Sequence, residues 1–313
     1  MVKYVLKRIL WMIFIVLAVA FVIFTVTYLT PGDPAQLLLG DNATKEEVEA
    51  LRATLGLDKS YFAQLGEFYY KTFIKFDFGT SWYYKVSVTD EMITRLPRTV
   101  GMGLASIILA NLIGIPLGIK AARKRGKWQD YGVIGASMVL VSLPGFWVAI
   151  IFVIIFAFTL NILPSHGIGG IQYYIIPVVV SAIGAAATTA RQTRSAMLEV
   201  INADFVYTVR AKGQKENIIV RKHIIPNGIM PIITMMGNQC ATVVAGSTIM
   251  ERVFSIPGVG LYLLNGVSYR DYPIIRTTTL FFAIFSAVII LLVDLVYAWL
   301  DPRIKAQYSK GRR

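Results

Sequence analysis

Cysteine, histidine and charged residues are scarce in this chain. Its 313 residues include one Cys and two His, and only 16% of them are Asp, Glu, Lys or Arg. The single Cys240 excludes a disulfide framework. His166 and His223 cannot form a His-Glu-x-x-His zinc site. Because a soluble domain carries roughly 25% charged residues, the composition indicates a membrane protein.

Motifs for hydrolysis or nucleotide binding are also missing. A phosphate-binding loop follows the pattern G-x-x-x-x-G-K-[ST], but Gly126-Lys127 is followed by Trp128 and lacks the earlier Gly. A serine hydrolase inside the membrane would need a base at the depth of its Ser, and His166 falls in an expected outer turn. If this chain transports a solute, its energy must come from elsewhere.

Ionisable residues are nearly absent from the long apolar runs. Proton- or sodium-driven carriers usually keep several such residues at membrane depth, because they are costly there and are retained for function. This chain offers Asp294 alone. We expect Asp294 to form a structural ion pair with a neighbouring Arg near the cytoplasmic surface rather than to relay protons.

Uncharged runs long enough to cross a bilayer recur along the chain. Crossing takes about 20 residues, and the runs 9–29, 100–119 and 228–250 contain 21, 20 and 23. The 60 uncharged residues of 131–190 divide at 161–172, where Pro, Ser, His and Gly indicate a turn. We therefore expect an all-α protein with six transmembrane helices: 9–29, 100–119, 132–160, 173–190, 228–250 and 277–300.

The first run could instead be a secretory signal, since Lys3, Lys7 and Arg8 precede it. A signal has an apolar core of only about 7–15 residues followed by a small-x-small cleavage site. The run 9–29 is longer and no such site follows Leu29, so a retained helix is favoured.

Basic residues are distributed unevenly between the two sides of the membrane. The segments before the first span and after the second, fourth and sixth hold 3, 5, 7 and 5 Lys plus Arg, against 5 acids in total. The opposite segments hold 11 basic and 12 acidic residues. Because short cytoplasmic loops retain Lys and Arg, both termini are expected in the cytoplasm. The net charge of +13 thus reflects orientation rather than a nucleic-acid ligand.

The expected extracytoplasmic loop 30–98 has helix signals of its own. Thr44 and Glu47 have capping-box spacing, and Gly56 stands where that helix would end. The stretch 61–78 is rich in Tyr and Phe. Aromatic residues gather at membrane–water interfaces, and we favour that role over a docking surface. The expected organisation is a cytoplasmic N-terminus and first helix at 1–29, the loop 30–98, a five-helix core 99–300 with a cytoplasmic loop at 191–226, and a cytoplasmic tail 301–313.

A few small or polar residues interrupt the expected spans. Gly114 and Gly118 form a small-xxx-small step that permits close helix packing. Pro116, Pro144 and Pro231 are expected to kink their helices around a cavity. For the translocation pathway we nominate four residues, although interhelical hydrogen bonding is the alternative role for the first two: Asn238, Gln239, Arg191 and Gln192.

The cytoplasmic loop 191–226 has two amphipathic stretches. Met197, Ile201 and Phe205 are spaced to share one face of a helix over 194–209, and Gly213 should end it. A second stretch, 214–225, leads to Pro226. From composition alone, a solvated pair of membrane-surface helices and a docking element for a partner protein are both open.

Short motifs recur in order along nearly the whole chain. They are TPGDP at 30–34, LGLD at 55–58, DFGTS at 77–81, RLP at 95–97, GIPLG at 114–118, PGFW at 144–147, ARQTRSAM at 190–197, RAKG at 210–213, FSIPGVG at 254–260, RDYP at 270–273 and DPR at 301–303. Together they resemble the permease subunits of ABC importers for dipeptides, oligopeptides and nickel. The cytoplasmic signature of that family begins with Glu-Ala-Ala, has a Gly six residues after the Glu, and ends in an apolar residue and Pro. Gly213, Ile225 and Pro226 match, whereas Tyr-Thr-Val at 207–209 replaces Glu-Ala-Ala.

The resemblance implies a type I ABC importer permease fold and a division of labour between subunits. In that family the cytoplasmic loop forms a coupling helix that sits in a groove of an ATPase. The residues that would carry this link here are Val209, Arg210, Ala211, Lys212, Gly213 and Gln214. A second homologous permease, two ABC ATPases and an extracytoplasmic substrate-binding protein would complete the importer in a bacterial or archaeal cytoplasmic membrane. ATP and Mg²⁺ would bind to the ATPases, and this chain would hold no cofactor, metal or catalytic residue.

The implied mechanism is alternating access driven by ATP in the partner subunits. Di- and oligopeptides are the favoured cargo; nickel, metal chelates, glutathione and some sugars use the same permease type. A stand-alone channel or secondary carrier without an ATPase is the alternative from a different class of protein.

Overall fold

The chain is almost wholly helical in a computed structural model that describes residues 2–300. Side chains 2–4, 243–246 and 297–300 lie outside the description, as do residues 1 and 301–313, which include the expected cytoplasmic tail and its DPR motif. The described residues form no β-strand, and Thr80 and Ser87 make one isolated antiparallel bridge. The expectation of an all-α protein is confirmed.

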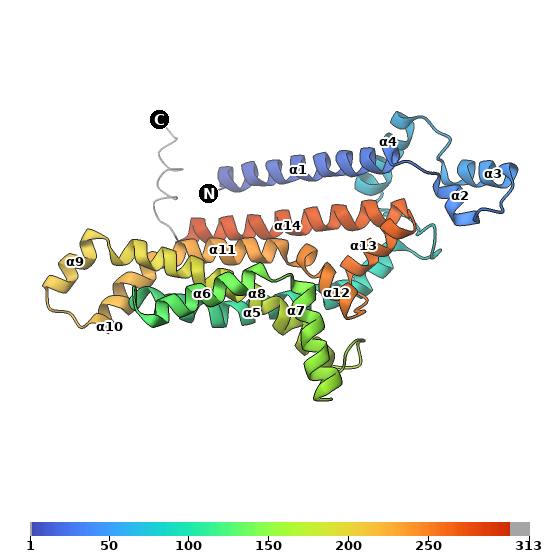
Figure 1. Cartoon of the computed structure of the whole chain (residues 1–313). Coiled ribbons are helices and arrows are strands. Elements are labelled where there is room, and N and C mark those ends of the chain that lie inside the picture. Colours follow the sequence, from blue (N-terminus) through green and yellow to red (C-terminus); the bar gives the residue numbers. More distant parts are fainter. Residues whose placement is uncertain (1, 301–313) are drawn as a thin grey trace. The chain divides into compact units, whose positions relative to one another are not determined.

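The described helices belong to two compact units (Figure 1). Unit 1 comprises 1–99 and 257–288, with α1 (Val2–Leu29), α2 (Pro34–Leu39), α3 (Lys45–Leu55), α4 (Tyr61–Tyr69), η1 (Tyr70–Ile74) and α13 (Val259–Ser268). Unit 2 comprises 100–256 and 289 onward, with α6 (Trp128–Ser142), α7 (Gly145–Phe152), η2 (Val153–Thr159), α8 (Gln172–Ile201), α9 (Asp204–Ala211), α10 (Glu216–Ile219), η3 (Val220–Ile224), α11 (Ile225–Gly246) and α12 (Thr248–Val253). The long helices α5 (Val88–Arg123) and α14 (Tyr272–Leu300) begin in unit 1 and end in unit 2.

Local capping residues set the ends of the short helices in unit 1. Asp33 caps α2 by accepting a hydrogen bond from the Ala35 amide at 3.0 Å. Thr44 and Glu47 form both hydrogen bonds of the expected capping box at the start of α3. Gly56 ends α3 in the left-handed region, at φ 71°, where glycine is favoured because it has no Cβ. The expected helix in this loop is confirmed at both ends.

Aromatic side chains from α4 and η1 pack against α1. Phe68, Tyr69 and Phe73 surround a small core with Ala20, and the Tyr69 hydroxyl donates to the Leu17 carbonyl at 2.7 Å. Other aromatics of the same stretch remain exposed, including Phe62, Tyr70 and Phe76. The stretch 61–78 therefore has one face that belongs to the fold and another that is free in the described residues.

Asp271, in the RDYP motif, has a structural role. Its buried carboxylate accepts hydrogen bonds from the Ser81 hydroxyl at 2.6 Å and the Tyr83 amide at 2.9 Å. It also accepts from the Ile274 amide at 3.3 Å in the first turn of α14. One carboxylate thus joins the loop before α5 to the start of α14, at the positive end of the helix dipole.

In unit 2, α8 packs against α6 and α11 (Figure 1). Helix α5 also packs closely against α8. A Cβ added to Gly114 would lie 2.6 Å from Thr189 Cβ and 2.7 Å from the Ala186 carbonyl oxygen. At Gly118 it would lie 2.5 Å from the Ala190 carbonyl oxygen. The small-xxx-small step is therefore the contact surface between α5 and α8, as its spacing predicts.

Four described helices are long and apolar enough to cross a membrane: Val5–Leu29, Val88–Arg123, Gln172–Ile201 and Tyr272–Val296. A fifth crossing is possible if α6 and the stretch Gly145–Thr159 count as one broken span. Helix α11 is not among these four. The membrane-spanning character is confirmed, and the count of six remains a prediction.

The expected span 132–160 is divided into two helices, and the kink expected at Pro144 is confirmed. The chain bends by 95° between α6 and α7. Leu143 is extended, at φ −83° and ψ 130°, because a residue before proline is disfavoured in the helical region. Pro144 then stands at the N-cap of α7 rather than inside a helix. By contrast, Pro116 and Pro231 do lie inside α5 and α11.

The contact between α5 and α8 can be tested with alanine. Gly114→Ala should destabilise the chain by about 1–3 kcal/mol, because the methyl group overpacks the contact with Thr189 and the Ala186 carbonyl. Gly101→Ala in the same helix meets no atom within 4 Å and should be neutral or slightly stabilising, since alanine favours helices over glycine. Thermal unfolding of the purified variants in detergent measures both. Equal unfolding temperatures would contradict this packing.

Candidate translocation cavity and coupling element

The segment between α8 and α11 is a helical hairpin, but it does not begin as the sequence suggested. The helix expected over 194–209 breaks after Ile201, and Ala203 is extended at ψ 144° before α9 starts. This break shifts the buried face by one residue, so Val206 is fully buried while Phe205 is 40% exposed. Met197 belongs to α8 and is buried, as its place in the pattern predicts.

A compact apolar core fixes the hairpin to unit 2. Val206 of α9, Ile219 of α10 and Ile224 of η3 pack with Met197 of α8. Ala122 of α5 and Ile232 and Met235 of α11 complete the cluster. Because buried side chains from α5, α8 and α11 hold it on several sides, α9 is anchored to the rest of unit 2 rather than suspended on a loop.

An ion pair closes the turn between α9 and α10. Arg210 donates to both carboxylate oxygens of Glu216, with Nη2 to Oε1 at 2.8 Å and Nε to Oε2 at 3.2 Å. These hydrogen bonds hold the pKa of Glu216 below its usual value. Gly213 turns the chain at φ 75°, which confirms the predicted helix break. The Gln214 amide oxygen lies 3.2 Å from His223 Nε2.

The predicted coupling residues therefore have two kinds of environment. Val209 and Arg210 are half-buried, with Val209 against the apolar core and Arg210 in the ion pair. The tip 211–214 is exposed. Tyr207, which is 55% exposed on α9, adds an aromatic side chain to this surface that sequence reasoning did not select. Its exposure depends on the break after Ile201, and no pattern in the sequence signals that break.

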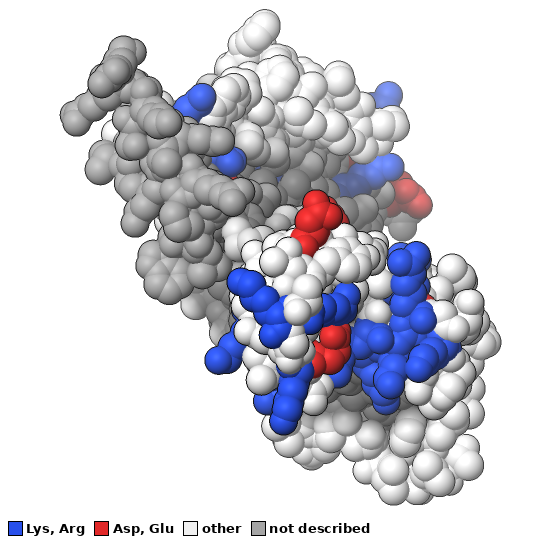
Figure 2. Space-filling view, turned by 90° about the vertical axis from the view of Figure 1, so that its left-hand side faces the viewer, with Lys and Arg blue, Asp and Glu red and all other residues white. Residues whose placement is uncertain are grey.

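Basic side chains gather around the hairpin (Figure 2). They come from the end of α5, from the turn after it and from the hairpin itself. The exposed ones are Arg123, Lys124, Arg125, Lys127, Lys212, Lys215, Arg221 and Lys222. Arg123 donates to the Asn217 side chain at 2.7 Å, which joins the two segments. This end of unit 2 therefore combines exposed aromatic residues with a dense positive charge.

A buried ion pair sits just before the hairpin. Asp130, in the first turn of α6, accepts hydrogen bonds from both Nε and Nη2 of Arg194 in α8, the latter at 2.8 Å. It also accepts from the Gly126 amide at 3.0 Å. The Asp130 side chain is 4% exposed, so this bidentate contact rigidly joins α6 to the part of α8 that leads into α9.

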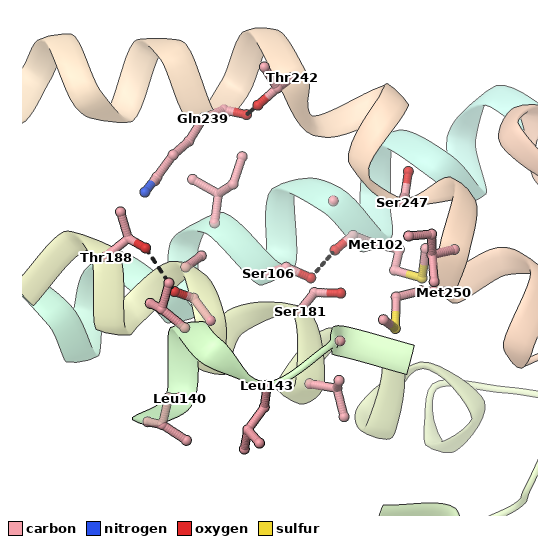
Figure 3. A pocket seen from close by; sticks show the side chains of 18 residues that line it. Met102, Ser106, Leu140, Leu143, Ser181, Thr188, Gln239, Thr242, Ser247 and Met250 are labelled. Carbon is pink, nitrogen blue, oxygen red and sulfur yellow. Dashed lines mark hydrogen bonds between the residues drawn. The ribbon is translucent and has the colours of Figure 1, made fainter. Parts of the chain in front are cut away.

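A cavity of about 440 Å³ lies among α5, α6, α7, α8, α11 and α12 (Figure 3). Its polar side chains are hydroxyls and one amide: Ser106, Ser181, Thr188, Gln239, Thr242 and Ser247. Ser106, Ser181 and Met250 lie together, and Gln239 and Thr188 lie farther along (Figure 3). No Asp, Glu, Lys or Arg is among the lining residues within the described part of the chain.

Three of the lining hydroxyls already donate hydrogen bonds to backbone carbonyls. Ser106 donates to the Met102 carbonyl at 2.8 Å, and Thr188 donates to the Gly184 carbonyl at 3.2 Å. Thr242 donates to the Asn238 carbonyl at 3.1 Å. Each hydroxyl oxygen keeps acceptor capacity, so the wall can form hydrogen bonds without offering a charge. Such a surface favours weak and unselective contacts with a polar solute.

Gln239 also belongs to a polar network that crosses three helices. Its Oε1 accepts from Asn111 Nδ2 of α5 at 3.0 Å, and its Nε2 donates to Thr189 Oγ1 of α8 at 3.0 Å. For Gln239, cavity lining and interhelical hydrogen bonding, the two roles considered from sequence, therefore coexist. Asn111 was missed, because a single Asn in an apolar run gives no sign of its partner.

The remaining nominated residues lie apart from this cavity. Asn238 is exposed, and neither Asn238 nor Arg191 is among the residues that line the cavity. Gln192 lines a smaller hollow of about 280 Å³ with Glu199 and Pro231. Asp294 is half-buried in α14, and its role in a structural ion pair remains a prediction.

Two transport permease proteins are similar to this chain over nearly its whole length. A putative peptide transport system permease protein of Brucella abortus (strain 2308) is 36% identical over 309 residues, which cover 96% of this chain and 98% of the relative. The glutathione transport system permease protein of Salmonella typhimurium is 36% identical over 305 residues, covering 97% of this chain and 99% of the relative.

Solved structures share the fold at a greater distance. A structure of the MetNI methionine ABC transporter, described as inward facing, aligns with a TM-score of 0.57 at 20% identity. The alignment covers 67% of this chain and 96% of the other. At this identity the likeness supports the fold of an ABC importer permease and nothing finer.

Two family models match the sequence. Residues 1–103 match the N-terminal model of binding-protein-dependent transport system membrane components, and residues 114–306 match the main model of the same proteins. The second match covers more than half of the chain and contains most of the residues that line the cavity, together with the hairpin of α9 and α10. This chain belongs to the family of binding-protein-dependent transport system inner membrane components, the permease subunits of ABC importers.

Proposed function

We propose that this chain is the pore-forming permease subunit of an ATP-driven importer of di- and oligopeptides. The observation that carries the proposal is the 36% identity, over 96% of this chain, to a permease named for peptide transport. A relative named for glutathione transport is equally similar, and glutathione is itself a short peptide. Peptides are therefore the substrate class that both relatives have in common.

In the membrane, we propose six crossings with both termini in the cytoplasm. The four long apolar helices, the bent pair α6–α7 and the helix α11 would supply them. The excess of Lys and Arg in alternate short loops supports this orientation. It places the hairpin of α9 and α10 in the cytoplasm and the segment 30–98 outside, in a cytoplasmic membrane.

The proposed mechanism is alternating access coupled to separate ATPases. One ATPase would receive α9 and the tip 211–214 in a groove, while ATP and Mg²⁺ bind to the ATPase pair. Because α9 is anchored by Val206 to a core that includes α5 and α11, a displacement of α9 would move these helices together. A second homologous permease would complete the pore, and an extracytoplasmic binding protein would deliver the peptide.

The cavity among α5, α8 and α11 suits passage rather than tight binding. A conducting site must bind its solute weakly enough to release it again. Uncharged hydroxyl and amide groups can replace the hydrogen bonds that a peptide makes with water, and they offer no fixed charge to trap either terminus. Peptides with different side chains could therefore move through the cavity.

Co-purification and uptake test the proposed function directly. A tagged form of this chain should purify from membranes with a second permease and with ABC ATPases. Proteoliposomes that contain the complex and its binding protein should take up a labelled tripeptide only when ATP is present on the ATPase side. Purification of the chain alone, with peptide uptake that needs no ATP, would contradict the proposal.

The turn at Gly213 provides a test of coupling. A β-branched side chain at φ 75° is strained by at least about 1–2 kcal/mol, although no neighbouring atom lies within 4 Å of the position. We expect Gly213→Val to lower peptide uptake per ATP hydrolysed while the chain still inserts into the membrane. Gly213→Asn is the matched control, because Asn tolerates the left-handed region. Equal coupling in both variants would exclude a role for this turn.

The ion pair between Arg210 and Glu216 can be inverted. Arg210→Glu places two carboxylates together and should uncouple ATP hydrolysis from uptake, whereas Arg210→Glu combined with Glu216→Arg should restore most of the coupling. Because Arg210 lowers the pKa of Glu216, the pair is complete above the usual carboxyl pKa and is lost only as pH falls through the lowered value. Coupling should therefore be constant near neutral pH.

A variant at Lys212 can test the proposed ATPase contact without disturbing the ion pair that closes the turn. It is exposed on the tip and has no ion-pair partner among the described residues. Lys212→Glu should weaken coupling through the ATPase contact while leaving the ion pair between Arg210 and Glu216 intact. If the inverted double variant stays uncoupled, Arg210 itself contacts the ATPase and does not act by closing the turn.

A further inference from the structure

Unit 1 contains a second cavity, of about 410 Å³, whose lining differs from that of the cavity in unit 2. It lies between the loop after α3, the segments 64–72 and 77–85, and the first turn of α14. Charged side chains of both signs line it, namely Glu67, Lys71, Asp77, Lys85 and Arg276. Phe68, Phe78 and Trp82 supply aromatic walls. Its volume is within the range of small-ligand pockets.

Arg276 is a half-buried cation that has no carboxylate partner among the described residues. Its Nε donates to Thr27 Oγ1 at 2.8 Å, and its guanidinium carbon lies 4.4 Å from the ring centre of Phe24 and 5.6 Å from that of Phe68. Among the described residues no Asp or Glu lies within ion-pair distance of it. Aromatic rings offset only part of the cost of removing a guanidinium from water. An entering carboxylate would therefore be stabilised here.

Asp77 is the complementary group on the same cavity. Its Oδ1 accepts a hydrogen bond from the Gly79 amide at 2.9 Å, and no cation of the described chain is within ion-pair distance. Thr277 donates to the Phe78 carbonyl at 3.2 Å, which places the residues next to Asp77 and Arg276 in contact. One carboxylate and one guanidinium therefore face the same cavity without pairing with each other.

Glu67, in contrast to Asp77, is a carboxylate of this cavity that already has ion-pair partners. Lys59 Nζ and Lys71 Nζ each lie 2.7 Å from one of its oxygens. Those two hydrogen bonds lower its pKa to about 2. Glu67 is therefore already paired with both lysines, whereas Arg276 and Asp77 remain available to a ligand, with Lys85 as an additional exposed cation.

We propose that this cavity binds a short peptide by its free termini, with the α-carboxylate on Arg276 and the α-ammonium on Asp77. The bidentate geometry of a guanidinium fits a carboxylate, and the aromatic walls can contact side chains of varied size. The site rests on the proposed function, since a peptide importer would supply this zwitterion. It would hold the substrate on the permease itself, outside the uncharged cavity of unit 2.

Blocked peptides test the two ends separately. The assembled importer, without nucleotide and without its soluble binding protein, is placed in phosphatidylglycerol nanodiscs, which exclude zwitterionic lipid headgroups as competitors. Trialanine, N-acetyl-trialanine and trialanine amide are titrated, and binding is followed by calorimetry. The wild type should bind trialanine at least about tenfold more tightly than either blocked peptide, because each loses one charge-assisted contact.

Two variants test which residue binds each terminus of the peptide. Asp77→Asn keeps the oxygen that accepts from Gly79 and removes the charge, so it should abolish discrimination against N-acetyl-trialanine only. Arg276→Gln should abolish discrimination against trialanine amide only. Asp58→Asn and Arg52→Gln alter similar charges outside the cavity and should bind like the wild type. Because Asp77 is exposed, its variant remains informative even if Arg276→Gln fails to fold.

The outcomes separate this inference from the proposed function. If the wild type binds the three peptides equally or not at all, or if both variants keep full discrimination, the site is refuted. ATP-driven uptake of trialanine by the complete importer in that case would leave the proposed function standing. Failure of uptake by the wild type would refute peptide transport itself, whatever the nanodiscs bind.

Discussion

The close approach of α5 to α8 is the contact on which the rest of unit 2 depends. Gly114 and Gly118 have no Cβ atom at the points where α5 approaches the backbone of α8 most closely. The two helices can therefore pack more closely than larger residues would allow. This approach brings Asn111 within reach of Gln239 and Gln239 within reach of Thr189. Without it, the buried Asn111 and Thr189 and the half-buried Gln239 would lose these hydrogen bonds in an apolar environment, at a cost for each unsatisfied group.

The same contact relates the cavity to the hairpin. Helix α8 lines the cavity with Ser181 and Thr188, binds Asp130 through Arg194, and then reaches the break before α9. Because these features lie on one continuous helix, the proposed coupling would transmit a displacement at the hairpin along α8 to the residues around the cavity. The bend at Pro144 turns α7 away from α6, which lets Leu143 and Gly145 contribute to the cavity wall.

The two units use charge in different ways. In unit 2, the buried charges Asp130 and Arg194 satisfy each other, and the cavity is left with hydroxyl and amide groups. In unit 1, Asp271 organises the loop before α5 with three hydrogen bonds, while Arg276 and Asp77 stay without an ion-pair partner among the described residues. An uncharged cavity and a charged pocket are therefore separate features of one chain.

Local signals in the sequence determined the all-helical class, most of the long apolar helices, the capping box at Thr44 and the turn at Gly213. Each of these depends on neighbouring residues through hydrogen bonding, apolar length or backbone sterics, so it can be predicted without knowledge of the fold. Ordered motifs likewise identified the family. Tertiary structure alone decided which face of α9 is buried, how far the chain bends at Pro144, and that Asn111 meets Gln239 and Asp130 meets Arg194. These pairs join residues 128 and 64 positions apart, and such contacts form only when separate helices pack together.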